Sequence, residues 1–167
     1  MLHLSLRSRR VVVVRRPGGA RSTEYRLRPG DYLYVGSAFG PGGLASRLGR
    51  HLSIRPKTRH WDIDFLASPE VADERAAWFL PSARKDGAEC RWATAISLVP
   101  GATPVTGAVG RMSARRGFGA GDCRRRCGCA AGVPDACRTH LFRVDWKPTP
   151  RRLGEWLGAR LIAFGAR

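Results

Sequence analysis

Between residues 31 and 52 the apolar pattern changes from the period of a strand to the period of a helix, across a glycine-rich turn. Residues 31–36 alternate, so that Tyr32 and Tyr34 are expected on one face of a strand. After the turn at 40–43, leucines at positions 44, 48 and 52 have the spacing of a single helix face. The change of period predicts a small mixed α/β fold.

The other segments favour the same fold class. Strands are expected at 2–6, where apolar and polar residues alternate, and at 11–14, a run of valines. A short helical element is expected at 60–66 and a longer helix at 87–99. Residues 75–80 fit either a strand or a helix, and the glycine-rich stretch 101–121 is expected to be a loop.

A final amphipathic helix is expected to begin at Thr149-Pro150, because a capping threonine followed by proline is typical of a helix start. Its apolar face would carry Leu153, Trp156, Leu157, Leu161 and Phe164. With strands early and helices later, the sequence predicts the α/β (α+β) class with a C-terminal amphipathic helix.

The charge of the chain points to the kind of partner. Its 167 residues include 30 Lys and Arg against 13 Asp and Glu, a formal net charge of +17. Two basic regions, residues 1–60 and 111–167, flank a mildly acidic middle. A polyanion is therefore the natural partner, the alternative being an ordinary solvated surface. The pattern of a membrane span or a signal peptide is not found, so we expect a cytoplasmic protein without a membrane partner.

Residues suited to phosphodiester hydrolysis lie in and after the strand and helix of residues 31–52. A phenol or an imidazole can take a proton from water, a guanidinium binds phosphate, and a carboxylate holds a divalent metal. Arg47 and His51 are four residues apart and therefore neighbours on one helix face, offset from the leucines. The candidate catalytic set is Tyr32, Tyr34, Arg47, His51, His60 and Glu89.

Each of these residues also has a purely structural explanation. Tyrosines pack at sheet edges and helical arginines are usually solvated. His51 can cap the C-terminus of its helix, and a carboxylate such as Glu89 is favoured near a helix N-terminus. The residue types alone therefore leave both interpretations open.

The order and spacing of these residues resemble the GIY-YIG nuclease superfamily, and most closely the small Uri-type endonuclease-like proteins of prokaryotes. The resemblance covers roughly residues 2–145. It is carried by seven blocks: Gly30 to Ala38, Gly40 to Leu44, Arg47 to His51, His60 to Asp64, Glu89-Cys90, Phe118 to Cys123 and His140 to Phe142.

The resemblance implies a divalent-metal-dependent endonuclease that cuts DNA or structured nucleic acid. Tyr34 would position or deprotonate the attacking water, Arg47 would contact the scissile phosphate, and His51 would assist proton transfer or phosphate binding. Glu89 would hold a single Mg²⁺ or Mn²⁺. Further contacts with nucleic acid, DNA above all, are expected from Ser37, Arg50, Arg55, Lys57 and Arg59.

The resemblance also implies an architecture. A small three-stranded, mainly antiparallel sheet flanked by helices would form a nuclease-like domain at residues 1–147. A cysteine-rich insertion at about 123–137 would interrupt it, and residues 148–167 would form a helical tail.

One signature of the superfamily is missing from this chain. Its Gly-Ile-Tyr motif should fall at or before Met1-Leu2-His3, where there is neither glycine nor tyrosine, and no pattern supports His3 as a replacement. Either the true start lies upstream of Met1, or a catalytic phenol has been lost. The second case predicts a catalytically impaired protein that still binds nucleic acid.

The cysteines form a second group of candidate ligands. Their spacing is not that of a standard zinc ribbon, which has paired Cys-x-x-Cys knuckles. A zinc site, free thiols in a basic loop and a disulfide all stay open. The candidate zinc ligands are Cys123, Cys129, Cys137 and His140, and a zinc-stabilised interaction module is the third functional hypothesis.

Overall fold

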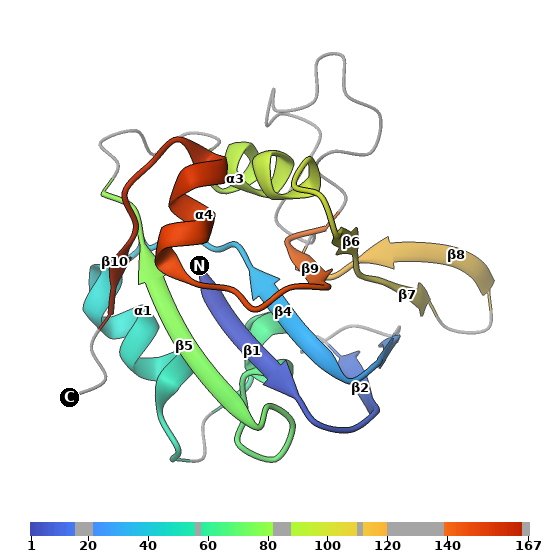
Figure 1. The fold of residues 1–167 in the computed structure, drawn as a ribbon. Helices are drawn as coiled ribbons and strands as arrows, with labels where there is room; N and C mark the ends of the chain where they lie inside the picture. The colour runs from blue at the N-terminus through green and yellow to red at the C-terminus, as the bar shows by residue number, and fades with distance from the viewer. Residues whose placement is uncertain (16–21, 56–57, 82–87, 110–111, 120–138, 165–167) are drawn as a thin grey trace.

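The computed structural model describes residues 1–15, 22–55, 58–81, 88–109, 112–119 and 139–164. Within these residues an antiparallel sheet of six strands forms the centre of the molecule (Figure 1), in the order β10-β5-β1-β4-β9-β6. Its strands are β1 (Leu2–Leu6), β4 (Gly30–Tyr34), β5 (Glu74–Phe79), β6 (Ala102–Pro104), β9 (Leu141–Val144) and β10 (Ile162–Ala163). The mixed, mainly antiparallel fold is confirmed, but the expected size of three strands is wrong. The segment of β5 fits a strand or a helix by its pattern, and β6, β9 and β10 have at most four residues each.

A second sheet of four strands, in the order β2-β3-β7-β8, lies against the first. Its strands are β2 (Arg10–Arg15), β3 (Ser22–Leu27), β7 (Thr106–Val109) and β8 (Met112–Gly117). The valine run at 11–14 is a strand, as expected. The loop expected at 101–121 is wrong, since β6, β7 and β8 all fall within it.

Four helices are found in the described part of the chain, and the last is shorter than expected. They are α1 (Gly43–Leu52), α2 (Asp62–Leu66), α3 (Ala88–Ser97) and α4 (Pro150–Leu157). Helix α4 begins as predicted, with the Thr149 hydroxyl accepting from the backbone N–H of Arg152. It ends at Leu157 because Gly158 adopts a left-handed conformation with φ of 59°. The chain then forms β10, which pairs with β5, so Leu161 and Phe164 do not extend the helix.

Both faces of the six-stranded sheet are covered. Tyr32 and Tyr34 of β4 face α1, α2 and the second sheet, as the alternation predicts. Leu33 and Val35 point to the other face, where α3 and α4 pack. Figure 1 shows α3 and α4 together on one side of the sheet, with α1 and β2 on the other. None of the described helices is long and apolar enough to cross a membrane.

The strand directions bring distant parts of the chain to one end of the sheet. β1 runs antiparallel to β4 and β5, and β4 runs antiparallel to β9. The start of β1, the ends of β4 and β5 and the start of β9 therefore lie side by side. In this register Leu2 lies opposite both Tyr34 and Ala77. Leu141 of β9 lies opposite Tyr34 on the other side of β4.

Candidate active site

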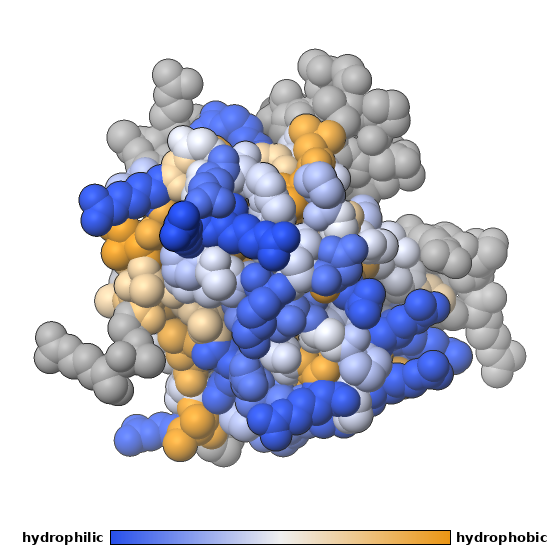
Figure 2. Space-filling model, in the orientation of Figure 1, coloured by the Kyte–Doolittle hydropathy of each residue, from blue (hydrophilic) through white to orange (hydrophobic). Residues whose placement is uncertain are grey.

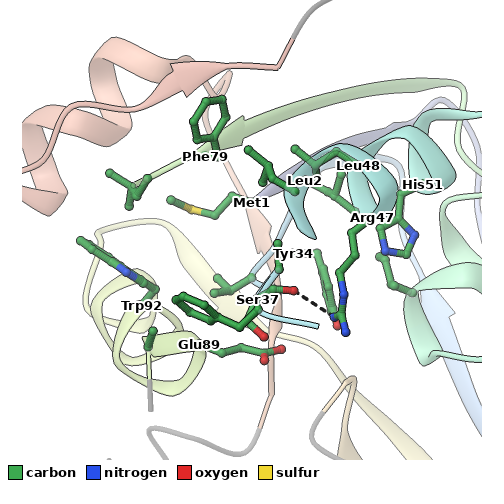
Figure 3. A pocket seen from close by; sticks show the side chains of 18 of the residues that line it. Met1, Leu2, Tyr34, Ser37, Arg47, Leu48, His51, Phe79, Glu89 and Trp92 are labelled. Atoms are coloured by element: carbon green, nitrogen blue, oxygen red, sulfur yellow. Dashed lines mark hydrogen bonds between the residues drawn. The ribbon is translucent and has the colours of Figure 1, made fainter. Parts of the chain in front are cut away.

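A pocket of about 500 Å³ lies at this end of the sheet, between α1 on one face and α3 on the other. Its lining includes Tyr34 from the end of β4, Arg47 and His51 from α1, and Glu89 from the start of α3. Figure 3 shows these side chains around the same opening. The fold thus gathers four of the candidate catalytic residues.

The Tyr34 ring is held between two glycines. A side-chain carbon added at Gly36 would lie 3.0 Å from one edge of the ring, and one added at Gly119 would lie 3.0 Å from the other edge. Phe118 meets the ring edge-on, with centroids 6.3 Å apart. The backbone N–H of Gly119 in turn donates to the Asp62 carboxylate at 3.2 Å, which ties this segment to α2.

Arg47 is positioned from two sides. Its guanidinium donates to the carbonyl oxygen of Ser37 at 2.9 Å, as Figure 3 shows, and lies 4.8 Å from the centre of the Trp61 ring. A side-chain carbon at Gly40 would come within 2.9 Å of Arg47 Nη2, so a larger residue there would displace the guanidinium. The backbone of Ser37 thus positions Arg47, and the remaining N–H groups of Arg47 can bind phosphate.

His51 is buried against Asp64, a carboxylate with no solvent exposure. Nδ1 of His51 lies 3.3 Å from Asp64 Oδ1, and Arg50 donates to Asp64 Oδ2 at 3.0 Å. Burial alone would raise the pKa of Asp64, but hydrogen bonds from His51, Arg50 and the backbone N–H groups of Trp61 and His60 hold that pKa well below its usual range. Asp64 thus lies directly behind His51, whose side chain lines the pocket.

Glu89 pairs with a histidine that directly precedes β9. The Oε1 atom of Glu89 lies 3.1 Å from Nδ1 of this residue, His140, which is 2% exposed. The Glu89 side chain is 27% exposed and lines the pocket. A single carboxylate of this kind suits Mg²⁺, which keeps several waters and takes few protein ligands.

Two of the candidate catalytic residues lie outside the pocket lining. The phenol of Tyr32 is buried and donates to the carbonyl oxygen of Arg28 at 2.7 Å, and burial raises the pKa of Tyr32. The side chain of His60 is exposed beside Trp61, and its backbone N–H donates to Asp64. The structure therefore places Tyr32 and His60 outside the pocket lining, and a catalytic role for either stays a prediction.

The arginines expected to contact phosphate differ in their exposure. Arg50 is partly buried in its ion pair with Asp64 and also lies 5.6 Å from the Trp61 ring. Arg55 and Arg59 are exposed, and Arg59 lies over the ring of Phe65. Lys57 lies outside the described residues.

On the strand next to Tyr34, the pocket has an aliphatic side chain. Leu2 is the β1 residue opposite Tyr34, and it lines the pocket. His3 points to the other face, where Nε2 lies 2.6 Å from Asp31 Oδ1 and the ring stacks on Trp78. His3 therefore lies outside the pocket lining.

The zinc hypothesis rests mostly on residues that the structure does not describe. Cys123, Cys129 and Cys137 lie outside the described residues, and His140 is turned toward Glu89. The described part of the chain contains no cluster of three metal-binding side chains. Zinc binding stays a prediction, whereas Cys90, expected to be a small buried residue, is buried.

Sequence reasoning left several contributors out of the site. The sequence pattern assigns no role to Asp64 or Trp61, although both organise the α1 side of the pocket. The apolar lining residues Phe79 and Trp92 were also missed. Only the fold reveals them, because no local spacing links them to Tyr34.

The family of this chain follows from sequence comparison. The family described as "Domain of unknown function DUF123" matches residues 1–157, which include every residue of the pocket. The chain belongs to the DUF123 family. No curated protein and no solved structure matches this DUF123 chain. The family description assigns no activity, so the chemistry must be argued from the pocket itself.

Proposed function

We propose that this DUF123 chain is a GIY-YIG-type endonuclease that hydrolyses phosphodiester bonds in DNA or structured nucleic acid with the help of one divalent metal ion. The observation that carries the proposal is that Tyr34, Arg47, His51 and Glu89 line one pocket, although they come from three separate elements. The net charge of +17 supports a polyanionic substrate.

The positions of these residues suggest a division of labour. Arg47, fixed by Ser37 and Trp61, presents N–H groups that bind the scissile phosphate and stabilise the charge that develops on it. His51, which lies beside Asp64, would assist proton transfer or phosphate binding. The Tyr34 phenol, fixed between glycines, orients the attacking water.

Glu89 is the residue that would hold the metal. Its carboxylate is partly exposed to the pocket and is steadied by His140, which fits an ion that keeps most of its waters. When bound, Mg²⁺ or Mn²⁺ would supply Lewis-acid stabilisation of charge on the phosphate oxygens.

A second candidate function is supported by Leu2. The side chain opposite Tyr34 has no hydroxyl, so this pocket has one phenol where the superfamily signature has two. A DUF123 protein of this kind would bind nucleic acid through Arg47 and its basic surroundings without cutting it.

A cleavage assay separates the two functions. Duplex, single-stranded and branched DNA and RNA are incubated with Mg²⁺ or Mn²⁺ and wild-type protein, Tyr34→Phe or Glu89→Gln. The matched controls are Tyr32→Phe, which changes a buried phenol outside the pocket, and Glu74→Gln, which changes an exposed carboxylate. We expect cutting that Tyr34→Phe and Glu89→Gln abolish and the controls retain. If the wild-type protein binds nucleic acid in a salt-sensitive way but does not cut it, the second candidate function, binding without cleavage, is supported instead.

A further inference from the structure

The pocket has an apolar half that the proposed chemistry does not use. Besides the polar residues, its walls include Leu2, Phe79, Leu80 and Trp92. Figure 3 shows Phe79 and Trp92 on one side, with Met1 between these two rings, and Arg47 and His51 on the other side. Tyr34, Ser37 and Glu89 lie between the two sides. We call the part lined by Leu2, Phe79, Leu80 and Trp92 the apolar compartment.

The pocket is larger than a phosphate group requires, and the aromatic side chains of the apolar compartment have no role in binding phosphate. Phosphate is bound by N–H groups and cations, which Arg47 and its neighbours supply. About 500 Å³ of space is within the range of pockets that enclose a whole organic ligand. Phe79 and Trp92 are both only partly buried, so aromatic surface stays open to whatever enters.

The apolar compartment is continuous with the polar end, and this continuity limits what can occupy it. If the proposed function holds, the sugar of the nucleotide at the cut is attached to the phosphate bound by Arg47. The group that this sugar carries is a nucleobase, which has two flat faces that stack well on aromatic side chains. A base stacked inside a duplex cannot enter such a pocket, whereas an unpaired or extruded base can.

We propose that the apolar compartment binds an unpaired nucleobase, with Trp92 and Phe79 as its aromatic walls. This inference rests on the proposed function and narrows its substrate to nucleic acid with an unpaired nucleotide at the cut site, as in a bulge, a flap or a single strand. Regular duplex is then a poor substrate.

The test measures binding, so that it does not depend on cleavage. A DNA duplex with one bulged nucleotide is compared with the same duplex carrying a tetrahydrofuran abasic residue at the bulge, by fluorescence anisotropy in EDTA. We expect wild-type protein to bind the bulge with the base about tenfold more tightly. Trp92→Ala should remove this preference, and Trp92→Phe, which keeps a ring, should retain part of it.

The matched control is Trp156→Ala, which removes an exposed tryptophan of α4 that does not line the pocket. It should leave the preference unchanged. A second probe is 2-aminopurine at the bulged position, whose fluorescence should be quenched by wild-type protein and not by Trp92→Ala. Thermal unfolding of each variant shows whether it is folded.

The outcomes distinguish this inference from the proposed function. If Arg47→Ala weakens binding of both duplexes but wild-type protein binds them equally, the base compartment is refuted and the nuclease proposal stands. If Arg47→Ala changes no binding at all, the proposed phosphate site fails. A Trp92-dependent affinity for an apolar dye, with no preference for the base, would assign the compartment to another class of ligand and overturn the inference.

Discussion

At the scale of single residues, the placement of the Tyr34 phenol depends on two neighbouring glycines, which have no side chain. Gly36 and Gly119 leave room for the ring, and Gly119 has φ of 74°, a conformation that residues with a side chain rarely adopt. The block Phe118-Gly119 was part of the sequence resemblance without a role. The structure gives it one, because it closes over Tyr34.

Gly119→Ala should therefore impair function more than stability. The positive φ costs about 1 kcal/mol of stability for alanine, and the added carbon pushes the Tyr34 ring aside. The control is Gly158→Ala, at φ of 59° with no atom near the added carbon. We expect similar losses in urea unfolding for both variants and a loss of DNA cleavage only for Gly119→Ala. Equal cleavage by the two variants would contradict this role.

Asp64→Asn should destabilise the fold by about 2 kcal/mol at neutral pH, because His51 and Arg50 lose their buried anion. The folded-state pKa of Asp64 lies below its unfolded value of about 4, so the carboxylate stabilises the fold fully above that pH and less as the pH falls below it. Urea unfolding at pH 7 and pH 3 should show the difference between wild type and variant shrinking in acid. Glu155→Gln, which changes an exposed ion pair, should stay within about 0.5 kcal/mol of wild type at both pH values.

At the scale of elements, the sequence predicted those segments whose pattern is local. Strand β4 and helix α1 follow from a change of period across glycines, and so does the meeting of Tyr34 with Arg47 and His51. Strands β6 to β8 were missed because residues 102–117 are mostly small, polar or basic, without an alternating apolar face. The pairing of Glu89 with His140 could not be predicted, since it requires α3 and β9 to meet across the sheet end.

The end of α4 illustrates a competition that the sequence does not settle. Leu161 and Phe164 continue the helical spacing, but Gly158 ends the helix and β5 offers backbone partners to the following residues. Leu161, which directly precedes β10, is then buried in the same cluster as Leu153. Tertiary pairing overrides the local period here.

Thr149→Ala should lower the stability of the protein by about 1 kcal/mol, because the first turn of α4 loses its side-chain cap. For a chain of this size the melting temperature should fall by about 2–4 °C. Thr149→Ser keeps the hydroxyl and should melt close to wild type. Equal melting of the alanine and serine variants would show that the cap contributes nothing.

At the scale of the whole molecule, three acidic residues near the pocket contact groups from other parts of the fold. Asp62, Asp64 and Glu89 face Gly119, Arg50 and His140 respectively. Figure 2 shows many hydrophilic side chains over the face with α4 and β9, and hydrophobic ones toward the side of β10, where Ile162 is exposed. Among the described acidic residues only Asp62 and Asp64 are buried, and the net charge of +17 still leaves a large excess of basic side chains over acidic ones.

The affinity for DNA should fall steeply with salt concentration, as binding releases counterions from phosphates. Removing one phosphate contact with Arg47→Ala should reduce the slope of log affinity against log salt by roughly 0.7–0.9. Arg151→Ala removes a cation of α4 that pairs with Glu155 and does not line the pocket, so its slope should match wild type. The slopes are measured by fluorescence anisotropy titrations at salt concentrations from about 50 to about 200 mM. Identical slopes for Arg47→Ala and wild type would place the phosphate contacts elsewhere.

The position of β1 has a consequence for synthesis on the ribosome. β1 comes first of the sheet's strands along the chain, yet it lies inside the sheet, with β4 on one side and β5 on the other. The other edge of β4 pairs with β9, at residues 141–144, and stays unpaired until that segment has been synthesised. A nascent chain shorter than this exposes apolar strand edges that invite aggregation. We therefore expect folding to finish only after β9 leaves the exit tunnel, and chains that stop earlier to need chaperones or be degraded.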